Sequence, residues 1–174
     1  MASTINWKVY TGSPLTESPP EAGSTAVNVN LLLLDIYDST AGSYAANPIS
    51  VPAAGSNYSF ERVIRAFWTG TFNEVTNVKL WKSSGTLSDA GISILADVTG
   101  TWAPAGQTSG ASTFATAAIP TTSGTALDAT PAAGSAYPAA GYSKYGVMQL
   151  LVKAAVTTPG DIGSQLIRFQ WDET

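Results

Sequence analysis

A long stretch with almost no charge limits what this chain can fold into. From Val98 to Ser143, 46 residues carry one ionisable side chain, Asp128, and are mostly Ala, Gly, Ser, Thr and Pro. Ordering a backbone costs about 1–2 kcal/mol per residue, roughly 45–90 kcal/mol here, which a few large side chains cannot offset. Soluble disordered segments normally carry charge. We therefore expect the stretch to lie against its own domain or against another protein.

The large side chains of this stretch are candidates for those contacts. Trp102 stands outside any clear strand pattern and is the leading candidate for contact with another chain, and Phe114, Tyr137 and Tyr142 are further interface candidates. An aromatic ring that stays exposed can also stack on a sugar. If the chain is instead a carbohydrate-binding module, Trp102, Tyr137 and Tyr142 are its expected stacking residues.

Composition indicates a folded domain and narrows its partners. The 174 residues suit one domain that can bury a core, and 44% are hydrophobic. Only 11% are charged, with a net charge of −4 and no basic run. Nucleic-acid binding needs clustered Lys and Arg, so we expect no nucleic-acid partner.

The chain contains no Cys and no His. Disulfides, thiolate nucleophiles and catalytic triads that depend on His are therefore excluded, and the common zinc and copper sites lose their usual ligands. The remaining carboxylate pairs lack a rigid setting, and the Asp35–Asp38 segment lacks the ligand density of a calcium loop. We expect no catalytic residue, no cofactor, no metal site and no enzymatic activity.

Neither the N-terminal residues nor the apolar runs predict a membrane or secretory route. Residues 1–4 show no basic or apolar leader pattern, and the longest apolar run, Leu31 to Leu34, is far too short to cross a bilayer. We expect a product made in the cytoplasm that makes no membrane contact.

Apolar residues at every second position predict strands through most of the chain. The expected strands cover residues 5–10, 27–34, 58–69, 73–82, 92–96, 145–156 and 166–171, with at most two short ones in the charge-poor stretch, near 112–119 and 126–127. A helix over 60–68 competes, but β-branched and aromatic residues favour a strand there. Trp7, Trp68, Trp81 and Trp171 lie on these strands and are expected in the core.

Short strands joined by Gly- and Pro-rich links predict an all-β fold. We expect residues 1–174 to form a single antiparallel β-sandwich or jelly-roll-like domain with long Gly/Pro/Ala/Ser/Thr-rich loops. Residues 98–143 are expected to be a charge-poor loop or arm excursion from that domain, because the other strands look sufficient to build it.

Three charges within five residues stand out in so uncharged a chain. On the expected strand 58–69, Glu61 and Arg65 share one face, whereas Arg62 lies on the other with its apolar neighbours. An Arg in such a position needs a partner. Two readings remain open: a structural ion pair, or a contact between subunits, where Arg is enriched.

Three groups of residues carry a resemblance to a known family. They are Gly55–Arg65 with Asn77–Trp81, then Gly141–Leu150, then Pro159–Gly160 with Ile167–Glu173. Together they resemble a family of small virion proteins from tailed bacteriophages, over the central and C-terminal two-thirds of the chain. The resemblance implies a β-rich particle component encoded among head and tail genes.

Residue chemistry and resemblance lead to one expectation of function. We expect a structural virion protein, a capsid decoration or cement subunit that contacts the major capsid protein or neighbouring copies as a homo-oligomer in the particle. Arg62, Trp102, Phe114, Tyr137 and Tyr142 are its expected interface residues. A head–tail connector, neck or tail component is the alternative within this class, and a carbohydrate-binding module for host attachment is the alternative outside it.

Overall fold

The computed structural model describes residues 3–11, 16–18, 31, 48–101, 110–157 and 163–174, and these are almost entirely strand and loop. The strands are β1 (Ser3–Thr11), β2 (Thr16–Ser18), β3 (Ser56–Tyr58), β4 (Arg62–Gly70), β5 (Val75–Ser84), β6 (Ile92–Thr99), β7 (Ala117–Ala118), β8 (Leu127–Asp128), β9 (Gly141–Tyr142), β10 (Tyr145–Lys153) and β11 (Leu166–Glu173). One 3₁₀ turn spans Ser123–Thr125.

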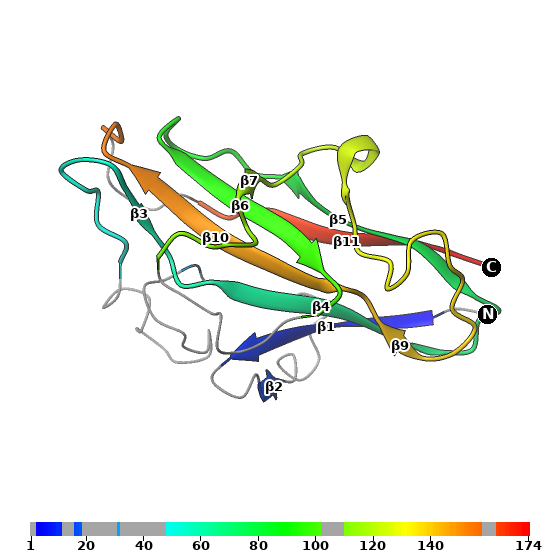
Figure 1. Ribbon diagram of the computed structural model, residues 1–174. Coiled ribbons are helices and arrows are strands. Elements are labelled where there is room, and N and C mark those ends of the chain that lie inside the picture. Colours follow the sequence, from blue (N-terminus) through cyan, green and yellow to red (C-terminus); the bar gives the residue numbers. More distant parts are fainter. Residues whose placement is uncertain (1–2, 12–15, 19–30, 32–47, 102–109, 158–162) are drawn as a thin grey trace.

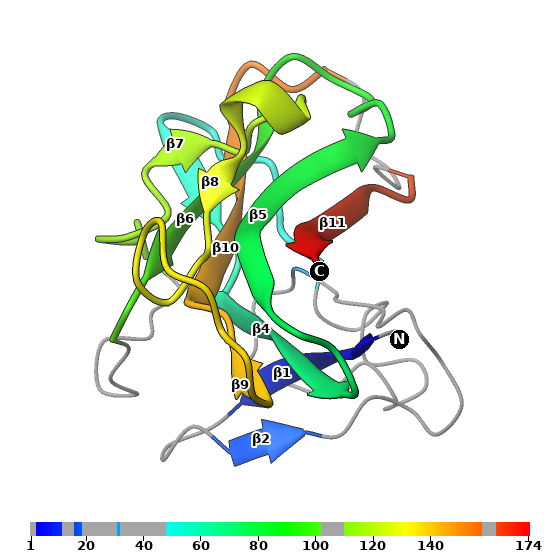
Figure 2. The ribbon, with the colours of Figure 1, turned by 90° about the vertical axis from the view of Figure 1, so that its right-hand side faces the viewer.

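The strands form two antiparallel sheets that pack against each other (Figures 1 and 2). In the larger sheet, sheet A, the order is β2-β1-β4-β10-β6-β7, with β3 beside β10 and β9 beside β4. In the smaller sheet, sheet B, β5 lies between β11 and β8. The predicted all-β, antiparallel sandwich is therefore confirmed.

The core lies between the two sheets and explains why these sequences form strands. On β4, Ile64, Ala66 and Trp68 are buried, and β10 and β6 contribute Met148, Leu150, Ile92 and Ile94 beside them. Sheet B faces this layer with Val75, Val78, Leu80 and Phe169. The sheets come so close that a Cβ on Gly146 of β10 would lie 2.7 Å from Cδ2 of Leu80.

The expected single strand over 58–69 is interrupted. β3 pairs Tyr58 with Leu151, and β4 pairs Arg62 with Met148. Three residues, 59–61, lie between the paired residues Tyr58 and Arg62, but only two, 149 and 150, lie between their partners on β10. The extra residue shifts the alternation, so Tyr58 does not share the face of Ile64 as the sequence pattern predicts. Beyond the interruption, the predicted alternation of Ile64, Ala66 and Trp68 against Val63, Arg65 and Phe67 agrees with the cross-strand register.

A second irregularity corrects the predicted faces of β5. The sequence alternation places Val75 with Trp81 and opposite Val78 and Leu80, but Val75, Val78 and Leu80 are all buried. Asn77 adopts a positive φ of 51°, and the register with β11 shifts at this point. One extra residue on β5 turns Val78 inward. Trp81 is half-buried outside the core cluster, so its expected core position is wrong, whereas Trp7, Trp68 and Trp171 contact or belong to the core.

The charge-poor segment is mostly loop, as expected, but its described part is not an excursion. β7 pairs with β6 of sheet A, β8 pairs with β5 of sheet B, and β9 pairs with β4 of sheet A. Ile119 and Ala129 belong to the buried core. The other strands alone therefore do not complete the core. The charge-poor segment crosses between the sheets and closes one side of the sandwich (Figure 2).

One expected strand lies almost entirely outside the described residues. It covers 27–34, and of these only Leu31 is described; it is not in a strand and packs, partly buried, against the core.

Among the residues that the structure describes, no helix is long and apolar enough to cross a membrane.

Candidate interaction surfaces

The charge-poor segment presents an exposed surface made of small side chains. Between residues 110 and 140 the exposed residues are Gly, Ala, Ser, Thr and Pro, with Asp128 as their only charged member. We call these exposed residues of 110–140 the small-residue surface. The segment runs along one side of the sandwich, from β7 over the 3₁₀ turn to the loop before β9 (Figure 2).

A buried glutamine fixes the first part of this surface. Gln149 on β10 is fully buried, and its Oε1 accepts a hydrogen bond from the Ser112 backbone N–H at 3.0 Å. Its Nε2 donates to the carbonyl oxygens of Ser59, at 2.8 Å, and Gly110, at 2.6 Å. Ser112 Oγ in turn accepts from the backbone N–H groups of Phe114 and Ala115. Residues 110–115 are thus held by a polar network rather than by apolar contact alone.

A second polar anchor holds the surface to sheet B. The hydroxyl of buried Thr130 accepts a hydrogen bond from the Val78 N–H at 3.0 Å, and the Ala129 N–H donates to the Val78 carbonyl at 2.8 Å. Both backbone groups of Val78 are therefore engaged at the bulge beside Asn77. The small-residue surface is ordered by its own domain at this point.

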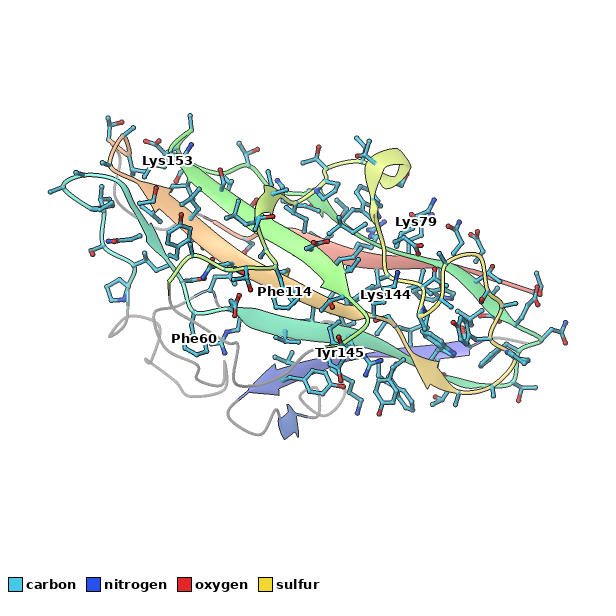
Figure 3. The ribbon with its side chains drawn as sticks, in the orientation of Figure 1. Phe60, Lys79, Phe114, Lys144, Tyr145 and Lys153 are labelled. Carbon is cyan, nitrogen blue, oxygen red and sulfur yellow. The ribbon has the colours of Figure 1, made fainter. Side chains whose placement is uncertain are left out.

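Asp128, the single charge of the surface, is held in its ionised form. Partial burial opposes ionisation, but hydrogen bonds from Thr130 and the nearby ammonium groups of Lys144 and Lys79 outweigh it and lower the pKa of Asp128. The Thr130 N–H lies 3.0 Å from Asp128 Oδ1. Figure 3 shows Lys79 on β5 and Lys144 in the link between β9 and β10.

Arg62, an expected interface residue, is not on the surface. Its side chain is 1% exposed at the start of β4, next to Glu61, which is also fully buried. Of the two readings left open by the sequence, burial favours the structural one, because a buried side chain does not reach another chain without local opening.

The other expected interface residues are placed differently from one another. Phe114 is half-buried in the loop held by Gln149, and Trp102 lies outside the described residues. The hydroxyl of Tyr137 accepts a hydrogen bond from the Ala132 N–H at 2.7 Å, and its ring lies 5.9 Å from that of Trp68. Its backbone also pairs with Val75. Tyr137 therefore has a structural role within its own domain.

Tyr142 belongs to a cluster that the sequence does not reveal as a unit. Two cations and four aromatic rings form a continuous series on the outer face of sheet A, which we call the cation–aromatic row; in order of contact it consists of Lys8, Phe67, Tyr142, Arg65, Tyr145 and Tyr10. Lys8 Nζ lies 5.5 Å from the Phe67 centroid, and the rings of Phe67 and Tyr142 are 4.4 Å apart. At the other end, Tyr10 and Tyr145 are 5.6 Å apart.

Arg65 stands at the centre of the row and is held from three sides. Its guanidinium carbon lies 4.7 Å from the Tyr142 centroid and 4.2 Å from the Tyr145 centroid. Its Nε donates to the Ser143 carbonyl at 2.7 Å. Ser143 is itself fixed, because its N–H and hydroxyl bond to the backbone of Ala66 on β4. Gly146 faces Leu80 of sheet B, so its neighbour Tyr145 lies on the opposite face of sheet A; Figure 3 labels Tyr145 near the start of β10.

The register of the strands explains why the row forms and why it was missed. β1 pairs with β4 so that Lys8 lies directly opposite Arg65 and Asn6 opposite Phe67, and β9 brings Tyr142 opposite Phe67. Two like charges directly opposite each other are unfavourable, and aromatic rings beside them offset part of this cost. The sequence signalled Arg65 and its outer face, but not the register that brings distant parts of the chain together.

Within the described ranges, no group of three or more acidic, His or Cys side chains is arranged to hold a metal ion. No protein-family model, no curated protein and no solved structure matches the chain.

Proposed function

We propose that this chain is a structural virion protein of a tailed bacteriophage that decorates or cements the capsid by binding neighbouring protein subunits. The observation that carries the proposal is the small-residue surface, which is ordered by its own domain and has one charge, Asp128, in 31 residues. The family resemblance supports the same class; it is carried by residues 55–65 with 77–81, by 141–150, and by 159–160 with 167–173.

The chemistry of this surface suits close contact with another protein. Removing charged groups from water is costly, so an interface that buries few charges avoids most of that cost. Ala, Gly, Ser and Thr lose little side-chain entropy on burial and let two backbones approach closely. A specific interface needs about 1,000 Å² or more of total buried area, and a surface running along one side of the domain can supply its share.

The anchors of the surface matter as much as its composition. Three kinds of contact fix the small-residue surface before a partner binds. β7, β8 and β9 pair with the two sheets, and the Gln149 network holds residues 110–115. Trp68 Nε1 also donates a hydrogen bond to the Ala139 carbonyl at 3.0 Å. Binding then costs little conformational entropy in this subunit.

The chemistry of the surface is compatible with one alternative function, a connector, neck or tail component, and weighs against the other, a carbohydrate-binding module. A connector, neck or tail component uses the same kind of contact, so only location separates it from a decoration protein. A carbohydrate-binding module needs free ring faces, but the ring of Tyr137 packs near Trp68 and that of Tyr142 contacts Phe67 and Arg65. These contacts weigh against sugar stacking by the two described candidates.

Co-sedimentation with purified phage heads that lack tails tests the proposal. We expect the chain to sediment with heads, and an Ala133→Glu variant, which places a charge on the small-residue surface, to lose most of this binding. Ala54→Glu is the matched control, because Ala54 is exposed outside that surface. Recovery of the chain only with tail fractions would overturn the capsid assignment, and equal binding by both variants would overturn the role of the surface.

A further inference from the structure

We infer that Arg65 is a preformed binding site for a carboxylate group carried by a partner protein. The inference rests on the geometry of the cation–aromatic row. It concerns the outer face of sheet A, not the small-residue surface, and does not depend on the virion assignment.

The orientation of the Arg65 guanidinium is determined by its neighbours. The rings of Tyr142 and Tyr145, at 4.7 and 4.2 Å, limit its movement on two sides, and the Nε–H bond to the Ser143 carbonyl fixes the third. An Arg side chain normally loses much rotamer entropy when it is immobilised. At Arg65 that cost is already met by the fold.

The donors left over are the ones that recognise a carboxylate. A guanidinium carries five N–H donors, and Ser143 takes only the one on Nε. In the described part of the chain, Arg65 makes no other hydrogen bond and no ion pair. Its terminal nitrogens therefore remain available for the paired hydrogen bonds that match the two oxygens of a carboxylate.

The surroundings favour an anion and a protein source for it. Lys8, directly opposite Arg65 in the register, adds a second positive charge to the row. Arg and Tyr are among the residue types most often found at the energetic centre of protein interfaces. A sugar carboxylate is the less favoured source, because the Tyr142 ring is already engaged by Phe67 and by Arg65 itself.

Fluorescence anisotropy with a labelled hexaglutamate peptide tests the site in the full chain at low salt. We expect measurable binding of hexaglutamate and none of hexaglutamine. Arg65→Lys keeps the charge but loses the paired donors, and we expect it to weaken binding about tenfold, as for loss of a charge-assisted bidentate contact. Arg168→Lys is the matched control, since Arg168 is an exposed arginine on β11 of sheet B, and its affinity should equal that of the unmodified chain.

A second measurement keeps the inference testable if the variants are poorly folded. In the unmodified chain, side-chain nitrogen NMR should show the Arg65 resonances shifting on addition of hexaglutamate, while those of Arg168 stay in place. Unchanged affinity of Arg65→Lys, an equal loss in Arg168→Lys, or equal binding of hexaglutamine would overturn the inference. Binding of polygalacturonate through Arg65 without binding of hexaglutamate would also overturn it, because the site would then belong to an acidic sugar.

Discussion

Replacement of Gln149 by Glu tests how the charge-poor segment is held. The two side chains have nearly the same shape, and the new carboxylate can still accept from the Ser112 N–H. It cannot donate to the carbonyls of Ser59 and Gly110, which lie 2.8 and 2.6 Å from Nε2 of the native side chain. Leaving the buried Ser59 carbonyl without its donor costs about 1–3 kcal/mol, and the new carboxylate is itself a buried charge that faces two carbonyl oxygens, so Gln149→Glu should destabilise by about 2–5 kcal/mol at neutral pH. For a chain of this size that corresponds to a Tm lowered by about 4–20 °C.

The pH dependence makes this prediction specific. Burial and two facing carbonyls raise the pKa of a carboxyl at position 149 above its unfolded value of about 4.3. Between these two pKa values the folded variant binds more protons than the unfolded chain, so its stability falls as the pH rises. The deficit relative to the unmodified protein should therefore be smallest below about pH 4.3 and largest at neutral pH, because a protonated carboxyl donates to one of the carbonyls again.

Urea unfolding followed by tryptophan fluorescence, run at pH 4 and pH 7, measures both effects. Gln149→Leu is the control: it removes the same two donor contacts, and the acceptor of the Ser112 N–H as well, but it has no proton to gain, so its deficit should not change with pH. Amide exchange at Ser112 should be faster in both variants. A Gln149→Glu deficit below about 0.5 kcal/mol at pH 7, within the range of ordinary surface substitutions, or a deficit equal at the two pH values, would refute the reasoning.

Three further outcomes test other parts of the fold. Gly146→Ala should lower the free energy of unfolding by about 1–3 kcal/mol, because the new Cβ meets Leu80 at 2.7 Å; Gly124→Ala, with nothing within 4 Å of its Cβ, is the control, and equal urea midpoints contradict the close approach of the sheets. Thr130→Val should cost about 1–2 kcal/mol by removing the acceptor of the Val78 N–H, whereas Thr130→Ser should restore most of that in thermal unfolding. Hydrogen bonds from the side chain and backbone of Ser3 lower the pKa of Glu173 from its ordinary 4.5, so the stabilisation from this contact is present above pH 4.5 and is lost as the pH falls through the lower pKa of the folded state. The difference in stability between the unmodified chain and Glu173→Gln should therefore narrow in acid, and a difference that stays constant with pH argues against the contact.

Local pattern predicted the elements well where apolar, β-branched and aromatic residues recur along a segment. The expected strands 5–10, 92–96, 145–156 and 166–171 correspond to β1, β6, β10 and β11, although burial alternates clearly only along β6, whereas β10 is buried on both faces at its centre. Pattern failed where one extra residue changes the phase. The residue inserted between β3 and β4 and the positive φ of Asn77 both reverse the alternation, and neither has a composition that distinguishes it from an ordinary strand position.

The candidate surfaces were predictable only in part, for a related reason. The lack of charge in residues 98–143 is a property of the sequence and correctly singled out a segment that needs contacts. Which contacts it makes depends on polar groups far away in the chain, such as Gln149 and Val78, whose bonds to it no local pattern encodes. In the same way, Arg65 was noticed as a charge, but Tyr142 and Tyr145 join it only through the pairing of β4 with β9 and β10.

The arrangement of sheet B sets an order of events during synthesis. β5 is made by residue 84, but both of its neighbours come from much later in the chain, β8 at residues 127–128 and β11 at residues 166–173. Until those residues leave the ribosome, β5 has two unpaired edges and the inner face of sheet A lacks its cover, which is the condition in which strands join the wrong partner. The scarcity of large apolar side chains between residues 98 and 143 then has a second consequence. While β5 and the inner face of sheet A await their partners, the ribosome is synthesising a segment that has few apolar side chains with which to aggregate.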